Sequence, residues 1–411
     1  EKDIISNIGL NNIAVDPFTV LYLEDNPAKH LKRAALFSKN TFIQGKNISL
    51  SKVTKKEKIR IGYFSSDFHT HPVMYLLIKA LEKHNKDNFE IFAYYFGLSK
   101  NDPMKDRVVK AVDKFYHLHD KENKEINELA KKDEIDIAID LTGYTDNSRT
   151  GIFSDRMAPI QVNFLGYTST MGTNFIDYII ADEVIIPKNL QKYYSEKPLY
   201  LPNCYMPTDD TRKISSKKLT RKQFNLPSDG IVFCSFNNSW KISPNEYDIW
   251  MRVLNKVDKS VLWLKDTNEY SKNNLRKEAI KRKINPKRII FAEKIDIEEH
   301  LARHKLADIF LDTFNYNGHS SSCDALWSGL PVVTKIGKGF SARVSASLLN
   351  TLGLSELITN SELDYEALIL KLAQDQNELN KIKVKLKNNL STSPLFNSEL
   401  YTKNLEKLYK E

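Results

Sequence analysis

The chain reads DIFLDTFNYNGHSSSCDALWSGLP from residue 308 to residue 331. An apolar strand, Asp308–Asp312, leads into a polar loop, and three serines then open a helical pattern that Gly329 and Pro331 close. Serine is a favoured N-cap because its hydroxyl oxygen accepts from free backbone N–H groups at a helix start. Those N–H groups and the positive end of the helix dipole bind anions. The stretch therefore predicts a strand–loop–helix unit with a pocket for a phosphorylated ligand.

Two further residues bear on this pocket. His319 precedes the serines Ser320 and Ser321, and Asp324 follows them. We place Asp324 in the first turn of the helix, where its carboxylate could reach a ribose hydroxyl. Three serines alone are explained better by ordinary helix capping than by a ligand. The flanking His319 and Asp324, together with a second anion signal upstream, favour a ligand site.

Buried strands alternate with helical patterns along the whole chain. With 411 residues and 41% hydrophobic content, the chain can bury large cores and is expected to form two domains. The alternation predicts an α/β layered architecture. The runs that we interpret as parallel strands are Ile59–Phe64, Phe89–Phe96, Ile135–Leu141, Ile160–Leu165, Tyr178–Ala181, Lys197–Leu201, Ile231–Phe236, Val261–Leu264 and Ile309–Asp312.

Four segments follow from changes in pattern along the chain. A helical pattern starts at Asp16-Pro17-Phe18, the stretch Pro207–Asp229 has little periodicity, and helical spacing returns at Asp364–Lys387 and Glu399–Lys410. We therefore expect a helical N-terminal segment with its linker at 1–57, an α/β domain at 58–206, a second α/β domain at 207–376, and C-terminal helices at 377–411.

Several classes of protein are disfavoured by composition. No apolar run is long enough to cross a bilayer, and no secretory signal is visible at the start. The three cysteines lack zinc spacing, which fits a reducing cytoplasm. The net charge of +9 is scattered and not interleaved with aromatic residues, so we expect no nucleic-acid partner. Neither a G-x-G-x-x-G fingerprint nor a Walker A loop is present, which disfavours a nicotinamide or flavin cofactor.

The second anion signal lies in Phe236–Glu246. Ser243 and Glu246 form a capping box with Pro244 at the first helical position, so a helix is expected to start there, directly after a buried strand. Open α/β sheets place ligands at this carboxyl edge. Lys241 stands just before the helix, where its ammonium could meet a diphosphate. A solvated lysine is the alternative, and the placement between strand and cap favours the functional interpretation.

Three more polar segments end predicted strands. Ser65–Pro72 places His71 at the start of a helix, where it could accept a proton or hydrogen-bond a sugar hydroxyl, although a structural role is the commoner one for a loop histidine. Leu141–Thr145 contains Tyr144 and Thr145, and Gln161–Tyr167 contains Leu165 and Gly166. Backbone groups at such glycine turns can approach a ligand closely.

Together these segments resemble the catalytic region of the O-linked N-acetylglucosamine transferase family, known as glycosyltransferase family 41. The resemblance is collinear from about Asp16 to the end of the chain. The motifs that carry it are Ser65–Phe68 with His71-Pro72, Ala158–Gln161 with Leu165–Tyr167, Asp177–Ile180, Phe236-Asn237 with Lys241, Asn317–His319 with Asp324, and Ser393–Phe396.

The resemblance implies a GT-B architecture, in which two Rossmann-like domains face each other across a cleft. It also implies roles for particular residues. Lys241, Ser320 and Ser321 would hold the UDP phosphates, and His319 would approach them. Asp324 would bind the ribose, and His300 would pack against the uracil. The remaining sugar-nucleotide contacts would come from Asn238, Tyr144, Thr145, Leu165 and Gly166, with His71 on the sugar and acceptor side.

The implied activity is inverting transfer of N-acetylglucosamine from UDP-GlcNAc to protein Ser or Thr hydroxyls, with neither a metal nor a cofactor. The absence of an Asp-x-Asp motif agrees with metal independence. The chain would be a bacterial-like member, because the family's tandem helical repeats are not visible in these 411 residues. Ile297 replaces a lysine found near the nucleoside in the best-studied members.

Three other functions stay open at this point. A related protein glycosyltransferase could use GDP-fucose, or could transfer glucose to asparagine. A nucleotide-binding scaffold without turnover is a second possibility, and a nucleotide-sugar epimerase of similar two-domain shape ranks last. The joint presence of His71, Lys241 and Asp324 favours an active UDP-dependent enzyme.

Overall fold

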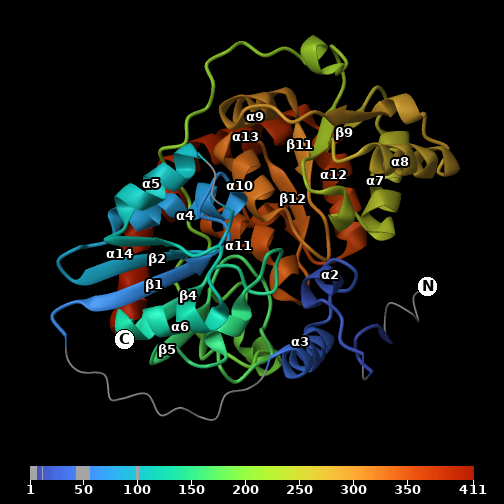
Figure 1. Ribbon diagram of the computed structural model, residues 1–411. Coiled ribbons are helices and arrows are strands. Elements are labelled where there is room, and N and C mark those ends of the chain that lie inside the picture. Colours follow the sequence, from blue (N-terminus) through green and yellow to red (C-terminus); the bar gives the residue numbers. More distant parts are fainter. Residues whose placement is uncertain (1–6, 12, 43–55, 99–100) are drawn as a thin grey trace. The chain divides into compact units, whose positions relative to one another are not determined.

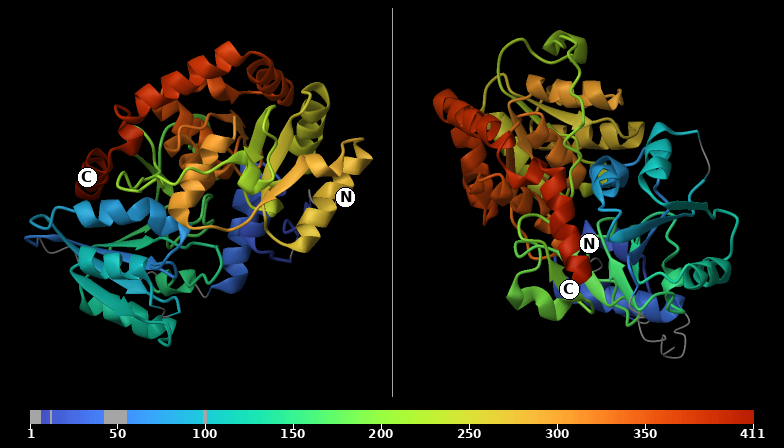
Figure 2. Two further views of the ribbon diagram at one scale, coloured as in Figure 1. Left: turned by 90° about the horizontal axis from the view of Figure 1, so that it is seen from above. Right: turned by 90° about the vertical axis from the view of Figure 1, so that its left-hand side faces the viewer.

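The computed structural model describes residues 7–11, 13–42, 56–98 and 101–411. Two parallel sheets organise this part of the chain, and helices lie on both faces of each sheet (Figures 1 and 2). The predicted α/β architecture with two Rossmann-like domains is therefore confirmed. Part of the predicted N-terminal linker, residues 43–55, lies outside the described residues.

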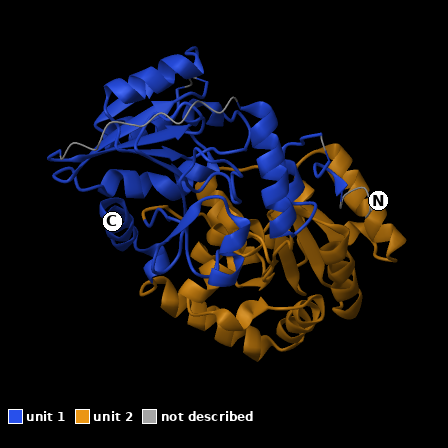
Figure 3. Cartoon of the chain, turned by 90° about the horizontal axis from the view of Figure 1, so that it is seen from below, with its two compact units in different colours: residues 1–210, 394–411 blue, residues 211–393 orange. Residues whose placement is uncertain are grey.

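The chain divides into two compact units (Figure 3). Unit 1 comprises Glu1–Asp210 together with Pro394–Glu411, and unit 2 comprises Thr211–Ser393. The unit boundary lies four residues beyond the position expected from the sequence. The expected C-terminal helical segment 377–411 does not stay together, because its last helix belongs to unit 1.

Unit 1 contains a seven-stranded sheet in the order β3-β2-β1-β4-β5-β6-β7. Every neighbouring pair in it is parallel, and Tyr63 of β1 lies beside Ala93 of β2 and Ile139 of β4. The strands are β1 (Ile59–Ser65), β2 (Phe89–Tyr95), β3 (Lys114–His117), β4 (Ile137–Asp140), β5 (Ile160–Asn163), β6 (Tyr178–Ala181) and β7 (Lys197–Tyr200).

The side chains of β1 show which helices cover each face of this sheet. Tyr63 points toward α4 (Pro72–Lys83) and α14 (Ser398–Lys410), where its hydroxyl contacts Tyr409. Phe64 points to the opposite face and packs against Phe153 of the short 3-10 helix η1 (Thr150–Phe153), beside α6 (Asn123–Lys132). Helix α5 (Pro103–Ala111) packs on α4.

Between residues 13 and 42, all of which the structure describes, two separate helices are found in place of the single helical pattern expected from Asp16 onward. They are α2 (Pro17–Leu21) and α3 (Pro27–Thr41). The two helices are separate because each has its own N-cap. Asp16 and Asn26 accept backbone N–H groups at the two N-termini, and a proline follows each cap.

Unit 2 contains a six-stranded parallel sheet in the order β10-β9-β8-β11-β12-β13. Its strands are β8 (Val232–Ser235), β9 (Val261–Lys265), β10 (Ile289–Ala292), β11 (Ile309–Leu311), β12 (Val332–Lys335) and β13 (Ile358–Thr359). Its helices are α7 (Pro244–Lys256), α8 (Glu269–Lys281), α9 (Ile297–Arg303), α10 (His319–Trp327), α11 (Val344–Thr351), α12 (Glu362–Gln374) and α13 (Gln376–Leu390).

Four strands were missed by the sequence patterns, namely β3, β10, β12 and β13. β3 is an edge strand with exposed ends at Lys114 and His117, so it carries no buried apolar run. β13 has only two residues. The expected helix Asp364–Lys387 is instead α12 followed by α13, because Asp375 ends the first and its carboxylate accepts the N–H groups of Asn377 and Glu378 at the start of the second.

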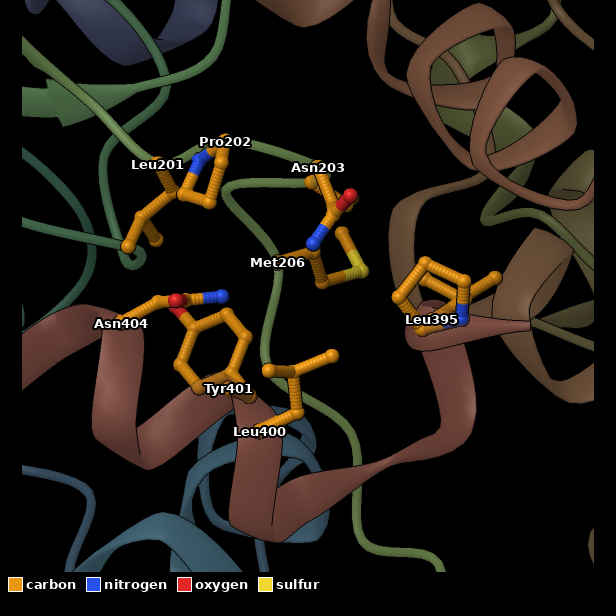
Figure 4. A pocket seen from close by; sticks show the side chains of 10 residues that line it. Leu201, Pro202, Asn203, Met206, Leu395, Leu400, Tyr401 and Asn404 are labelled. Atoms are coloured by element: carbon orange, nitrogen blue, oxygen red, sulfur yellow. The ribbon is translucent and has the colours of Figure 1, made fainter. Parts of the chain in front are cut away.

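The last helix, α14, is bound to unit 1 by side chains on both of its faces. Tyr401 donates from its hydroxyl to the carbonyl of Tyr205 over 2.6 Å, and Glu406 accepts from the Asn85 N–H over 2.6 Å. Figure 4 shows Tyr401 and Leu400 beside the 201–206 segment, where they line a small cavity. This cavity has no charged lining residue and lies at the interface between α14 and the 201–206 segment.

Within the described ranges, we find no helix that combines the length and the apolar character required to span a bilayer.

Replacing Leu405 by Ala tests the packing of α14. Leu405 is fully buried, so the substitution removes apolar contacts and leaves a cavity. We expect the free energy of unfolding to fall by about 2–5 kcal/mol, measured by urea denaturation followed by circular dichroism. Lys407→Ala on the exposed face of the same helix is the control and should change stability little. Equal stability of the two variants would contradict this assignment of α14.

Candidate functional site

The carboxylate of Asp312 organises the loop between β11 and α10. It is fully buried and accepts from the N–H of Thr313 at 2.9 Å and from the N–H of Gly318 at 2.7 Å. The Thr334 hydroxyl donates to its second oxygen over 2.7 Å. Burial raises the pKa of this carboxyl, while the hydrogen bonds act in the opposite direction. Sequence patterns identified Asp312 only as the end of a strand.

Helix α10 begins earlier than expected, which corrects the assignment of the serines as caps. The N-cap is Gly318, and the helix starts at His319, so Ser320 and Ser321 lie inside the first turn. A Cβ atom on Gly318 would come within 2.5 Å of the Ser322 hydroxyl and 2.7 Å of the Asn237 side-chain oxygen. Only glycine fits here, because Asn237 and Ser322 crowd the start of the helix.

The first turn of α10 retains unsatisfied backbone donors. His319 donates its N–H to Asn317, whereas the N–H groups of Ser320 and Ser321 have no acceptor among the residues that the structure describes. Free N–H groups at a helix start, together with the helix dipole, attract anions. The side chain of Ser321 is already committed, since its hydroxyl donates to Asn237. The N–H groups of this turn are therefore free to bind an anion, and the Ser321 hydroxyl ties the turn to Asn237.

Lys241 lies against the same loop. It ends the 3-10 helix η4 (Ser239–Lys241), and its side chain extends to donate to the Asn317 carbonyl over 2.9 Å. The ammonium also stands 4.1 Å from the centre of the Tyr316 ring. Lys241 is only 9% exposed, and no carboxylate of the described residues lies within ion-pairing distance. Burial lowers its pKa to about 7, although attraction to Asp312 opposes the shift. A buried, unneutralised ammonium beside free helix N–H groups is suited to bind a phosphate.

His319 adjoins Lys241 from the first position of α10. Its ring stacks on Tyr316 with 4.5 Å between the ring centres, and Nε2 contacts the Ser341 carbonyl over 3.1 Å. Burial and then the nearby Lys241 lower the pKa of this imidazole well below its ordinary value. The ring is therefore neutral near pH 7 and donates from Nε2, which leaves Nδ1 as an acceptor.

Asp324 lies in the second turn of α10, which corrects its expected place in the first turn. Its carboxylate is paired with Arg212, whose guanidinium also lies 5.9 Å from the Trp327 ring. Burial raises the pKa of Asp324, and Arg212 opposes the shift. The sequence patterns did not identify Arg212 as a site residue, because it lies in Pro207–Asp229, a stretch with little periodicity. A ribose hydroxyl would reach a carboxylate that is already fixed in place by this pair.

Two further predicted residues lie on other elements of unit 2: Asn238 follows β8, and His300 is on α9, which follows β10. The side-chain oxygen of Asn238 accepts from the Lys265 ammonium over 2.6 Å. His300 on α9 packs beside Phe236 and receives a hydrogen bond at Nδ1 from Arg303. Burial, followed by repulsion from His304 and Arg303, lowers the pKa of His300. Its ring is therefore uncharged, as a stacking surface for a base requires.

In unit 1, His71 caps α4. Its Nδ1 accepts the Val73 N–H over 3.4 Å and lies 3.6 Å from the Asp67 carboxylate. Burial lowers the pKa of this histidine, and attraction to Asp67 opposes the shift. Because Nδ1 accepts, the proton of the neutral ring sits on Nε2. In this arrangement the Nε2–H of His71 is the hydrogen-bond donor of the neutral ring.

The remaining predicted residues of unit 1 follow β4 and β5, which pair in the sheet. Leu165 has a φ of +69°, and a Cβ atom on Gly166 would lie 2.0 Å from the Leu141 carbonyl oxygen, so this turn is rigidly shaped. Tyr144 is 3% exposed and donates from its hydroxyl to Met171, and the Thr145 hydroxyl donates to Thr142. Their hydroxyl protons are thus used within the protein.

The predicted residues therefore gather into one group in each unit. In unit 2, Lys241 lies at the start of α10 beside His319, Ser320 and Ser321; Asp324 is further along the same helix, Asn238 follows β8, and His300 is on α9. In unit 1, His71, Tyr144, Thr145, Leu165 and Gly166 follow strands β1, β4 and β5. Among the described residues, no three His, Cys, Asp or Glu side chains are grouped closely enough to hold a metal ion.

A family model describes nearly the whole of this chain. The model of glycosyl transferase family 41 matches residues 27–219 and 213–405. These two matches together contain every residue of the groups described above.

Curated relatives and a solved structure agree with this match. A probable UDP-N-acetylglucosamine–peptide N-acetylglucosaminyltransferase, SEC, of Arabidopsis thaliana is 32% identical over 96% of this chain and 41% of its own length. The corresponding transferase of Caenorhabditis elegans is 28% identical over 87% of this chain and 41% of its own length. The chain thus spans about two fifths of these relatives. A mutant of the Thermobaculum terrenum O-GlcNAc transferase superposes with a TM-score of 0.87 at 25% identity, covering 96% of this chain and 75% of that one, which is consistent with the GT-B class.

The buried ammonium of Lys241 predicts a dependence of stability on pH. Between a pKa of about 7 in the folded state and 10.5 as the ordinary value, the unfolded chain binds the proton and the folded chain does not. The contribution of Lys241 to the free energy of unfolding is therefore lowest below pH 7, and it rises as the pH increases from about 7 to 10.5. Urea denaturation at several pH values should show a wild-type slope steeper than that of Lys241→Met by up to about 1 kcal/mol per pH unit. Lys277→Met, on the surface of α8, should keep the wild-type slope, and parallel curves for all three proteins would contradict the burial of this charge.

Proposed function

Because this chain belongs to glycosyltransferase family 41, we propose that it transfers N-acetylglucosamine from UDP-N-acetylglucosamine to serine or threonine hydroxyls of proteins. The anion site formed by Lys241 and the first turn of α10 is the observation that carries the proposal. The names of the similar proteins from A. thaliana and C. elegans support the choice of donor and acceptor.

The leaving group of this reaction is a diphosphate, which gains negative charge as the bond to the sugar breaks. Groups that are fixed in place before the reaction stabilise such charge most effectively. Lys241 is held by Asn317 and Tyr316, and the Ser320 and Ser321 N–H groups are held by the helix and by Asp312 through Gly318. We infer that these donors take the place of a metal ion, so that transfer proceeds without one.

The acceptor hydroxyl would attack the anomeric carbon from the side opposite the diphosphate. A new carbon–oxygen bond forms there as the bond to the diphosphate oxygen breaks, which inverts the configuration, and the proton of the acceptor hydroxyl is released to solvent water. His71 would donate from Nε2 to an oxygen of the sugar or of the acceptor and hold it in line. Leu165 and Gly166 would shape the sugar pocket through the rigid turn after β5. The Asp324–Arg212 pair would hold the ribose, and His300 would face the base.

Titration of the chain with UDP-GlcNAc, compared with Lys241→Met, tests the donor site. A charged hydrogen bond contributes about 1.5–3 kcal/mol, so the substitution should weaken binding by at least about tenfold and abolish detectable transfer to a peptide. Lys277→Met is the matched control and should bind as the wild type does. EDTA should change neither binding nor rate.

Unchanged UDP-GlcNAc affinity in a folded Lys241→Met protein would remove the phosphate role. Inhibition by EDTA that a divalent cation reverses would contradict the metal-free reaction. A preference for GDP over UDP in the same titration would reassign the donor to a guanosine diphosphate sugar.

His71→Ala should separate turnover from donor binding. Because His71 acts on the sugar or the acceptor, its loss should lower kcat by about fivefold to a hundredfold, the range for a polar group left without its hydrogen-bond partner. The affinity for UDP should stay close to that of the wild type. His117→Ala, on the edge strand β3, should leave both constants unchanged. A variant with normal kcat and weakened UDP binding would contradict the role given to His71.

A further inference from the structure

A cavity of about 640 Å³ opens at the carboxyl edge of the unit 1 sheet. Its lining comes from the segments that follow four strands: Ser66 after β1, Phe96–Leu98 after β2, His119–Glu122 after β3, and Asn147–Arg149 after β4. The sheet order β3-β2-β1-β4 places the switch in chain direction between β1 and β4, next to this cavity. Ligands of open parallel sheets bind at this point of the fold.

The cavity adjoins the histidine that we assign to the acceptor side. His69 belongs to its lining, and the ring centres of His69 and His71 are 5.8 Å apart. Two of its lining segments are in close contact, because a Cβ atom on Gly97 would lie 2.1 Å from the Ser66 carbonyl oxygen. A polypeptide whose hydroxyl is held at His71 could therefore place a neighbouring side chain in this cavity.

Arg149 brings a fixed positive charge to the cavity. Its Nε donates to Asn123 over 2.9 Å, Nη1 donates to the Leu118 carbonyl over 3.3 Å, and Nη2 donates to the Lys121 carbonyl over 2.6 Å. A guanidinium has five N–H groups, so two are left for a ligand. No carboxylate in the part of the chain that the structure describes pairs with Arg149, and only burial acts on its pKa, which is lowered.

The acidic residues of the lining do not neutralise this charge. Glu122 is occupied by the capping box at the start of α6, where its carboxylate accepts a backbone N–H. The carboxylate of Asp120 is 95% exposed and lies 4.0 Å from His119 at the rim. The cavity thus offers an arginine with spare N–H groups and no inward-facing carboxylate that compensates it. A half-buried charge of this kind is stabilised most when an anion completes the pair.

We propose that this cavity binds an acidic side chain of the acceptor polypeptide, close in sequence to the hydroxyl that is modified, with Arg149 as its partner. The inference rests on the proposed transferase function for the identity of the polypeptide as an acceptor. It adds a specificity determinant that acts on the acceptor and is built entirely from unit 1.

Pairs of peptide libraries test the proposal. Each library carries one serine in a random neutral sequence, and the two members of a pair have either Glu or Gln fixed at one flanking position. Binding to the whole chain is measured by fluorescence polarisation without any donor, for each flanking position in turn. We expect Glu to be preferred about tenfold at one position, as for a charged hydrogen bond. Arg149→Gln should abolish this preference, and added salt should weaken it.

Lys124→Gln is the matched control, because it removes the same charge from the outer face of α6, where the side chain is 81% exposed. It should retain the preference for Glu. Since Arg149 also holds the loop at 118–123, Arg149→Lys provides a second test: it keeps the charge and should retain part of the preference. If wild-type protein shows no preference at any position, or if Arg149→Gln retains it, the proposal is wrong.

Binding of UDP-GlcNAc, measured separately on the same proteins, distinguishes this failure from failure of the proposed function. A chain that binds UDP-GlcNAc and modifies peptides without regard to Glu would overturn the cavity assignment alone. A chain that prefers Glu through Arg149 but does not bind UDP-GlcNAc would support the acidic-peptide site and contradict the transferase.

Discussion

The buried carboxylate of Asp312 is the constraint on which the unit 2 site depends. It ends β11, and its oxygens bind the backbone at both ends of the loop 313–318 and the hydroxyl of Thr334 on the neighbouring strand. The loop therefore has one conformation, which sets where α10 begins and presents the Asn317 carbonyl to Lys241. A buried carboxylate destabilises the fold unless it is fully hydrogen-bonded. Here the hydrogen bonds that stabilise Asp312 are also the ones that fix the loop before α10.

Both units carry cations that the protein itself leaves without a matching carboxylate among the described residues. Lys241 in unit 2 is held by a carbonyl and an aromatic ring, and Arg149 in unit 1 is held by carbonyl and amide oxygens. These neutral partners orient the charge without cancelling it. Two buried arginines are instead paired with carboxylates, Arg212 with Asp324 and Arg33 with Glu24. The contrast separates groups that stabilise the fold from groups that remain available to a ligand.

The sequence predicted the central strands of both sheets well, because parallel strands buried on both faces read as continuous apolar runs. It failed at β3, which has exposed ends, at β13, which has only two residues, and at β10 and β12, which are runs of only four residues each. It also placed the serines at the N-cap of α10, whereas Gly318 occupies that position. Serine is the better cap by local preference, but the space beside Asn237 and Ser322 admits no side chain at 318.

The sequence by itself was sufficient to identify local features at the ends of strands. These are the Ser243–Glu246 capping box, Lys241 before it, and His71 before Pro72. Those features depend on neighbours a few residues apart, so the order of residues suffices to find them. Only the tertiary structure decided that Lys241 meets the start of α10, that Arg212 pairs with Asp324, and that Arg149 lacks an acidic partner among the described residues. The atoms in these contacts are tens of residues apart in the chain, and whether a charge is paired depends on which side chains the packed sheets bring within a few ångströms of it.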